Sequence, residues 1–144
     1  VTQHRDEGLR ETLIFEAYAR YAKALVGVGE ASGDDGYRGM EIELVAAANP
    51  YTDDTGGGLP VDLFYLGEPL ADALMTVFER APDGSVETRA LRSDGSGRAN
   101  VTVSPGHDYL VDAVVIRKPS DALAEQYRAV WESVWASLTF SVPE

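Results

Sequence analysis

Four side chains that could bind a divalent metal lie close together in the stretch "RSDGSGRANVTVSPGHDYLVDAVVI". These side chains are Asp94, His107, Asp108 and Asp112. Carboxylate oxygens and imidazole nitrogens are ligands that zinc and nickel accept in proteins, and such a site needs about four to six of them. The sequence holds only one other histidine, His4. A metal site is therefore possible only if the local elements bring these four side chains together.

The elements around this set predict a turn, a strand and a second turn. Ala99, Val101 and Val103 alternate with polar residues between the turn "SDGSGR" and the turn "SPGHD". Successive turns of a meander lie at opposite edges, here separated by roughly five residues of about 3.3 Å each. We therefore expect Asp94 and His107 to lie too far apart to share an ion. We expect Asp94 to cap its own turn, and His107 and Asp108 to be exposed turn residues.

Neither the acidic loop at 29–39 nor the serine and carboxylate residues of the chain form a recognisable site. The loop "GEASGDDGYRG" at 29–39 has adjacent carboxylates at Asp34 and Asp35 but lacks the spaced ligands and final glutamate of an EF-hand, so we expect a flexible loop. No serine stands in a "GxSxG" elbow, and no carboxylate pair is marked as an acid–base couple. We therefore predict that the chain is not an enzyme, and we assign no catalytic, cofactor-binding or metal-binding residue.

Three aromatic residues near the end of the chain are candidate ligand contacts. They are Tyr127, Trp131 and Trp135, and their spacing of four would place them on one face of a helix. Such a stripe could stack on a sugar or clamp a peptide, or it could cover the core of the fold. Both interpretations remain open from the sequence. Glu132, between the tryptophans, is expected to be solvated.

Composition excludes several classes of function. The chain has 144 residues with 24 acidic and 12 basic side chains, so its net charge is −12. This charge repels phosphate backbones, and we expect no nucleic-acid partner. The absence of cysteine excludes disulfides and thiol catalysis. No apolar run approaches the roughly 20 residues of a membrane span.

Hydrophobic periodicity predicts a mainly β protein. Residues 1–29 are the exception. Here Ile14, Tyr18, Tyr21 and Leu25 recur at helical spacing, which predicts an N-terminal helix. From residue 40 onward apolar residues alternate in short runs, with turn signals about every 8–12 residues, as in a β-sandwich. A short helix capped by Ser120 or Asp121 is expected before a last strand. We therefore predict an antiparallel immunoglobulin- or transthyretin-like sandwich at 40–144, preceded by a helix and loop at 1–39.

Four motifs resemble known families. They are "RYAKALVGVG", "GLPVDLFYLGEPLADALMTVF", "SDGSGRANVTVSPGHDYLVDAV" and "WESVWASLTF". The middle two are similar to transthyretin-like modules of the carboxypeptidase-regulatory and collagen-adhesin B types. Together, the four motifs resemble an exported bacterial family of unknown function that is described as a nickel-uptake-associated periplasmic protein.

The resemblance implies a prealbumin-like sandwich that is exported to the periplasm or the cell surface. It also implies an association with nickel or cobalt uptake, with a histidine-bearing segment near the mature amino terminus of the whole protein. This chain begins at Val1 and carries no such segment, so we expect it to be part of a longer protein. Any divalent metal would then be bound through that missing region, and no cofactor is expected here.

Three hypotheses about function follow. The first is a non-catalytic, exported β-sandwich that serves as an accessory or binding domain and is associated with transition-metal uptake. The alternative is a periplasmic or cell-surface module that binds a protein or a glycan, with Tyr127, Trp131 and Trp135 as candidate contacts. The third is a fragment of an enzyme. Calorimetry with metals and the exposure of the tryptophans would separate the first two.

Overall fold

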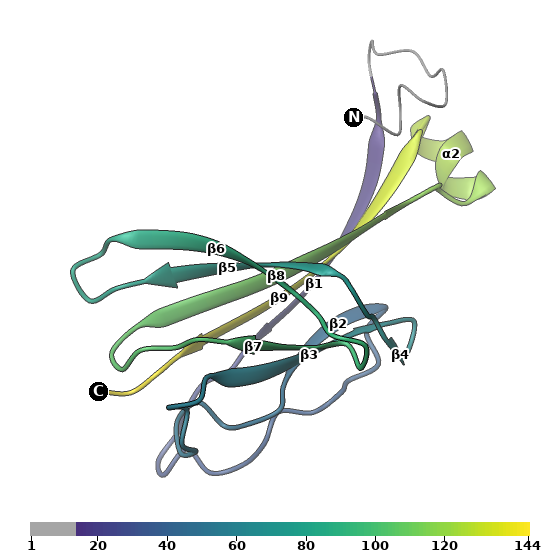
Figure 1. The fold of residues 1–144 in the computed structure, drawn as a ribbon. Coiled ribbons are helices and arrows are strands. Elements are labelled where there is room, and N and C mark those ends of the chain that lie inside the picture. Colours follow the sequence, from purple (N-terminus) through teal and green to yellow (C-terminus); the bar gives the residue numbers. More distant parts are fainter. Residues whose placement is uncertain (1–13) are drawn as a thin grey trace. The chain divides into compact units, whose positions relative to one another are not determined.

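A computed structural model describes residues 14–144, which form nine β-strands and one short helix (Figure 1). The elements, in chain order, are β1 (Glu16–Ala24), β2 (Ile42–Ala46), β3 (Leu59–Tyr65), β4 (Glu68–Pro69), β5 (Leu74–Arg80), β6 (Val86–Arg92), β7 (Arg98–Val101), β8 (Asp108–Arg117), α2 (Asp121–Tyr127) and β9 (Trp131–Ser141). The prediction of a mainly β fold, with two sheets and a short helix before the last strand, is confirmed.

The strands form two sheets. One sheet has five strands in the order β1-β9-β8-β5-β6, and the other has β3 at its centre, with β2 on one side and β4 and β7 on the other. The register pairs Leu44 with Leu63 across β2 and β3. In the five-stranded sheet, Val77 pairs with both Arg89 of β6 and Val111 of β8. The pairs of β3 with β2, β4 and β7, and of β5 with β6 and β8, are antiparallel.

The prediction of an N-terminal helix is wrong for residues 16–24, because they form strand β1. Residues 1–13 of that prediction lie outside the described residues. The segment "EAYARYAKA" also alternates with period two, and its exposed and half-buried side chains alternate along β1. Two hydrogen bonds show that β1 follows β9 in the same direction: Val130 N to Phe15 O and Leu25 N to Thr139 O, each 2.8 Å. Partnership with β9 therefore outweighs the helical spacing of the tyrosines.

The described residues divide into two compact units. Unit 1 comprises residues 14–19 and 115–134, which include the first part of β1, the end of β8, α2 and the start of β9. Unit 2 comprises residues 20–114 and 135–144, and it contains β2 to β7 with most of β8 and β9. That a domain boundary lies at residue 39 stays a prediction.

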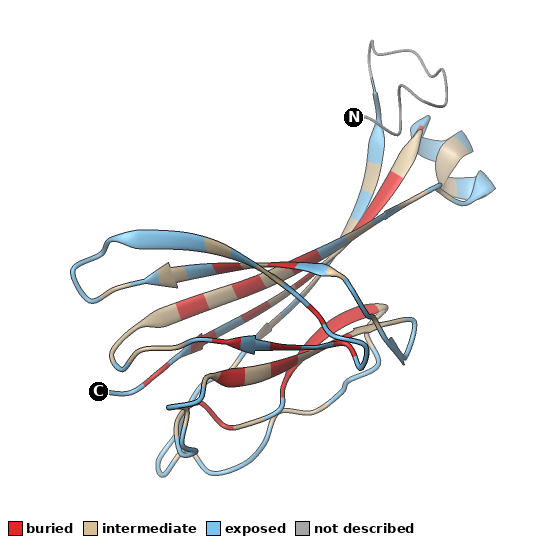
Figure 2. Cartoon of the chain, viewed as in Figure 1, coloured by how far each residue is buried: buried red, intermediate tan, exposed pale blue. Residues whose placement is uncertain are grey.

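The core of unit 2 lies between inward-facing side chains of both sheets. Every second residue of β3 is buried, and the same alternation appears in β8 and β9 (Figure 2). The largest fully buried apolar side chains of this core are Tyr109, Phe140, Ile42, Leu44, Leu59, Leu63, Met75 and Leu138. The rings of Tyr109 and Phe140 stack at 5.2 Å between centroids. Burial of these side chains is the main source of stability, at about 25 cal/mol per Å² of apolar surface.

The turn before β7 depends on one glycine. Gly97 has a φ of +79°, and a Cβ at this position would lie 2.9 Å from the carbonyl oxygen of Leu63. Its own carbonyl accepts a hydrogen bond from Leu63 N at 2.9 Å, so the turn is held against β3. A side chain here would force backbone atoms apart and would also be strained by the positive φ.

We expect Gly97→Ala to lower the free energy of unfolding by about 1–3 kcal/mol. Gly95→Ala is the matched control two residues away, because a Cβ at Gly95 meets no atom within 4 Å. Urea denaturation monitored by tryptophan fluorescence measures both changes. An equal, small effect of the two substitutions would show that the turn does not hold β3 in this way.

Candidate functional site

The structure does not bring the opening set of candidate ligands together as a metal site. Asp94 caps its own turn, as predicted: its Oδ1 accepts hydrogen bonds from Ser96 N at 2.8 Å, Ser96 Oγ at 2.7 Å and Arg98 N at 3.1 Å. These bonds lower the pKa of Asp94, with the Ser96 hydroxyl as the largest cause. The Asp94 carboxylate therefore stabilises its own turn.

The other three side chains have separate partners. Asp108 accepts hydrogen bonds from Ser141 Oγ at 2.5 Å and from Arg80 Nη2 at 2.7 Å, and both lower its pKa. Asp112 lies opposite Thr76 on β5, and burial raises its pKa. His107 is not an exposed turn residue as predicted, because its side chain is mostly buried and Nδ1 lies 2.8 Å from Glu79 Oε1.

Glu79 is the centre of a polar cluster at one end of the core. Tyr109 donates a hydrogen bond to Glu79 Oε1 at 2.7 Å, and Arg89 Nη1 pairs with Glu79 Oε2. Arg89 also donates to the carbonyl of Thr102, in the segment that follows β7. Burial alone would raise the pKa of Glu79, but the hydrogen bonds from Arg89 and Tyr109 outweigh it and leave the pKa lowered. The cluster links the two sheets, which is a structural role.

A second charged cluster, which the sequence did not indicate, lies between β1, β2 and the loop at 29–39. Lys23 Nζ lies 2.8 Å from Asp35 Oδ2 and 3.1 Å from Glu43 Oε1. The Asp35 side chain is 3% exposed and the Glu43 side chain is 0% exposed. Glu43 also accepts from the backbone N–H groups of Arg38 and Met40, and Asp35 accepts from Ala46 N at 3.0 Å. Glu43 of β2 is therefore buried among its partners, and Asp35 anchors the loop at 29–39 to β2.

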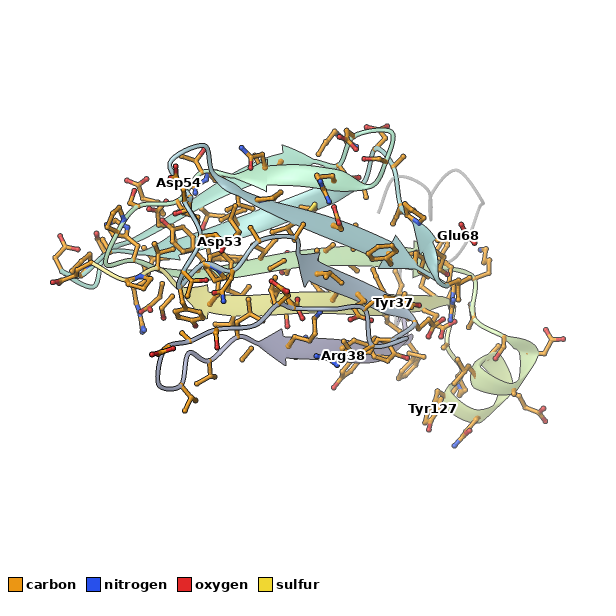
Figure 3. All side chains as sticks on the ribbon, turned by 90° about the horizontal axis from the view of Figure 1, so that it is seen from below. Tyr37, Arg38, Asp53, Asp54, Glu68 and Tyr127 are labelled. Carbon is orange, nitrogen blue, oxygen red and sulfur yellow. The ribbon has the colours of Figure 1, made fainter. Side chains whose placement is uncertain are left out.

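A cavity of about 500 Å³ lies beside this cluster in unit 2. Its walls come from the end of β1, the loop at 25–35 and the segment at 48–51. Two of its polar side chains are hydrogen-bonded to the backbone: Asn49 donates to the carbonyls of Ala31 and Gly33 at 2.7 Å, and Tyr51 donates to Leu25 O at 2.6 Å. These hydrogen bonds hold the loop at 25–35 against the segment at 48–51. Figure 3 shows the neighbouring loops with Arg38, Asp53 and Asp54.

The three aromatic candidates do not share a helical face. The helix α2 ends at Tyr127, because Arg128 adopts a left-handed conformation with φ of 55°, and Trp131 and Trp135 lie on strand β9. Both tryptophans are half-buried. A cation covers each ring: Lys118 Nζ lies 4.0 Å from the centroid of Trp131, and Arg20 Cζ lies 5.5 Å from that of Trp135.

Tyr127 is the exposed member of the set, and α2 determines its position. Ser120 caps the helix, as predicted, by accepting a hydrogen bond from Leu123 N at 3.3 Å. Leu123 and Tyr127 are four residues apart and therefore project from the same side of α2. No residue of α2 is buried, and the Tyr127 side chain is 53% exposed (Figure 3).

A second cavity of about 500 Å³ lies in unit 1, and we call it the aromatic pocket. The residues that line it are Phe15, Glu16, Ala17, Tyr18, Ala19, Leu123, Tyr127 and Glu132. Phe15 is 45% exposed and Tyr18 is 68% exposed, so three aromatic side chains around one cavity are accessible to solvent. Ala17 and Ala19 alternate with the larger residues of β1, and their small side chains leave room for the cavity.

The carboxylates of the aromatic pocket differ in their partners. Glu132 forms a bidentate ion pair with Arg117: Nε donates to Oε2 at 2.8 Å and Nη2 donates to Oε1 at 2.9 Å. This pair lowers the pKa of Glu132. Glu132 is thus buried and paired rather than solvated as predicted. Glu16 accepts a hydrogen bond from Ser133 Oγ, which is a neutral partner. The pocket therefore presents aromatic walls with a carboxylate among them.

Comparison with known proteins gives one family. The model of a domain of unknown function, DUF4198, matches residues 4–117. The chain belongs to this family. No curated protein matches the chain.

In this DUF4198 domain, residues 14–144 contain no group of three or more histidine, aspartate and glutamate side chains placed to hold a metal ion. Within the same described range, no helix is long and apolar enough to cross a membrane.

Sequence reasoning missed Phe15 and Tyr18 as pocket residues because it placed both on a helix. In strand β1 successive side chains point to opposite faces, and the two residues would not have been grouped with Tyr127 from sequence alone. The period-two alternation of residues 16–24 could have indicated strand β1, but it could not have indicated the pocket. The pocket also depends on pairing between distant segments, which no local pattern reports.

Proposed function

We propose that this DUF4198 domain is a non-catalytic binding module of an exported protein, and that it contacts its partner through the aromatic pocket of unit 1. The observation that supports this proposal is the exposure of Phe15, Tyr18 and Tyr127 around a single cavity. Tyrosine and phenylalanine provide large contact areas at low entropic cost and are enriched at binding interfaces. The charged groups of unit 2 described above are instead held in ion pairs within the fold.

An association with nickel or cobalt uptake is proposed for the whole exported protein, not as metal coordination by this chain. Its support is the sequence resemblance described above. Isothermal calorimetry of the purified chain with Ni²⁺, Co²⁺ and Zn²⁺ is expected to show no heat of binding at micromolar protein. Binding of one equivalent of Ni²⁺ under these conditions would contradict this proposal and would require a metal site in the chain itself.

The contact surface is tested by a panel of peptides and a panel of glycans, screened for binding to the chain by fluorescence anisotropy or on an array. We expect ligands of one class to bind, and Tyr127→Ala to weaken the binding about tenfold through loss of its aromatic contact. Tyr37→Ala is the matched control, because Tyr37 is an exposed tyrosine of unit 2. Binding that is unchanged in Tyr127→Ala, or absent for both classes, would contradict the proposal.

A further inference from the structure

The geometry points to a cationic side chain as the ligand of the aromatic pocket: we infer that it accepts a lysine or arginine from a basic segment of a partner protein. This inference rests on the proposed function and names the chemistry of its ligand. Four observations carry it: the aromatic walls, the carboxylate of Glu16, the cation–π pairs already present in unit 1, and the charge of the chain.

Aromatic walls favour a cation over a neutral ligand when a negative charge lies nearby. The face of an aromatic ring carries negative electrostatic potential, and it attracts ammonium and guanidinium groups within about 6 Å of its centre. Tyr18 comes from β1, Phe15 directly precedes this strand, and Tyr127 comes from α2, so rings from two distant segments border the pocket. A cation that enters between them can contact more than one ring.

The carboxylate of Glu16 provides the counter-charge. Of the two carboxylates that line the pocket, Glu132 is already neutralised by its pair with Arg117. The Ser133 hydroxyl hydrogen-bonds to Glu16 without adding positive charge. A ligand cation beside Glu16 would therefore form a new ion pair rather than compete with an existing one from Ser133. A neutral sugar would gain no comparable electrostatic attraction.

Unit 1 already places cations on its aromatic rings. The guanidinium carbon of Arg128 lies 5.7 Å from the centroid of Phe15, which is itself a wall of the pocket. Lys118 Nζ lies 4.0 Å from the centroid of Trp131. The chain's own side chains thus show that rings in this unit contact positively charged groups at cation–π distance.

The charge of the whole chain favours the same class of partner. With 24 acidic and 12 basic residues, the net charge of −12 attracts basic segments and repels acidic ones. This long-range attraction raises the rate of encounter, and the pocket then provides a specific place for one side chain. A basic peptide should therefore bind with an affinity that falls as ionic strength increases.

The test compares peptides and variants by fluorescence anisotropy at two salt concentrations. The probe is a labelled peptide with lysine and arginine residues. The control peptide has the same sequence with acetyl-lysine and citrulline, which remove the positive charges. We expect the charged peptide to bind the wild-type chain at least about tenfold more tightly. We expect Tyr127→Ala to weaken its binding by about tenfold and Glu16→Gln by about fivefold.

Tyr37→Ala and Glu87→Gln are the controls, because both residues are exposed and lie in unit 2. They should change the affinity less than about twofold. Equal binding of the charged and neutral peptides, or equal loss in the pocket and control variants, would overturn the inference. Tyr127-dependent binding of a neutral oligosaccharide in place of the basic peptide would overturn it while keeping the proposed function. Absence of binding by peptides and glycans alike would overturn both.

Discussion

Lys23→Met is expected to lower the free energy of unfolding by about 3–5 kcal/mol. Lys23 is the cation that lies between Asp35 and Glu43, at 2.8 Å and 3.1 Å, and both carboxylates are almost completely excluded from water. Removing one partner of a buried ion pair leaves the remaining charges without compensation in a medium that solvates them poorly. Two buried carboxylates, rather than one, would be left in this case. Urea denaturation of the wild type and the variant measures the difference.

Arg92→Met is the matched control for this prediction. Arg92 also pairs with a carboxylate, that of Asp72 at 3.2 Å, but both side chains are largely exposed, at 60% and 86%. Exposed pairs contribute about 0–1 kcal/mol, so the control should have little effect. The structural role of the buried cluster would be contradicted if Lys23→Met and Arg92→Met changed stability to the same small extent.

Glu79→Gln is expected to destabilise the chain by about 1.5–3 kcal/mol at neutral pH. The substitution keeps the size of the side chain but removes the charge that Arg89 and His107 face and that Tyr109 hydrogen-bonds. Arg89 would then be left beside a neutral amide in a mostly buried position. Thermal or urea unfolding at pH 7 measures the loss. Glu87→Gln, at an exposed position of β6, is the control.

The lowered pKa of Glu79 predicts that the destabilising effect of Glu79→Gln depends on pH. The pKa of Glu79 in the folded chain is lowered from its ordinary value of 4.5, so its ionised form stabilises the fold. That contribution is fully present above the unfolded value and is lost as the pH falls through the lower folded value. The difference in stability between the wild type and Glu79→Gln should therefore be largest near neutral pH and decrease below about 4.5. A difference that stays constant down to pH 3 would show that charge is not what Glu79 contributes.

Much of the β fold could be predicted from the sequence because its signals are local. Val61 and Leu63 in β3, and Met75 and Val77 in β5, alternate with the residues that face outward, and the turn residues around Gly84 and Gly97 separate the runs. A two-residue period with turn residues at its ends is sufficient to identify strands. The short helix α2 could be predicted for the same reason, since Ser120 is a local cap.

Strand β1 could not be assigned in this way, because its tyrosines also satisfy helical spacing. What decides its conformation is pairing with β9, more than a hundred residues later in the chain, as the hydrogen bond from Leu25 N to Thr139 O shows. The end of α2 is a similar case. The pattern from Leu123 to Val134 suits a continuing helix, but Arg128 turns the chain and β9 begins at Trp131. In both places tertiary pairing overrides a local preference.

The candidate site was predicted only in part. Tyr127 was identified as a candidate contact, and it does line the aromatic pocket. Phe15 and Tyr18 were not grouped with it, because their proximity arises from two distant segments of unit 1. The buried position of Glu43 was missed for a related reason. A charged residue that alternates with Ile42 and Leu44 normally faces water, and its burial is explained by Lys23 together with the backbone N–H groups of the loop that donate to it.

The measurement that tests the central claim most directly is a map of the bound ligand on the chain by ¹⁵N–¹H NMR. The ligand is the one from the peptide and glycan panels that binds most tightly, titrated into the labelled wild-type chain. We predict that the amide signals that shift belong to residues 15–19, Leu123 and Tyr127, which line the aromatic pocket. Shifts confined to residues 23–51, around the cavity of unit 2, would contradict the assignment of the binding surface to unit 1.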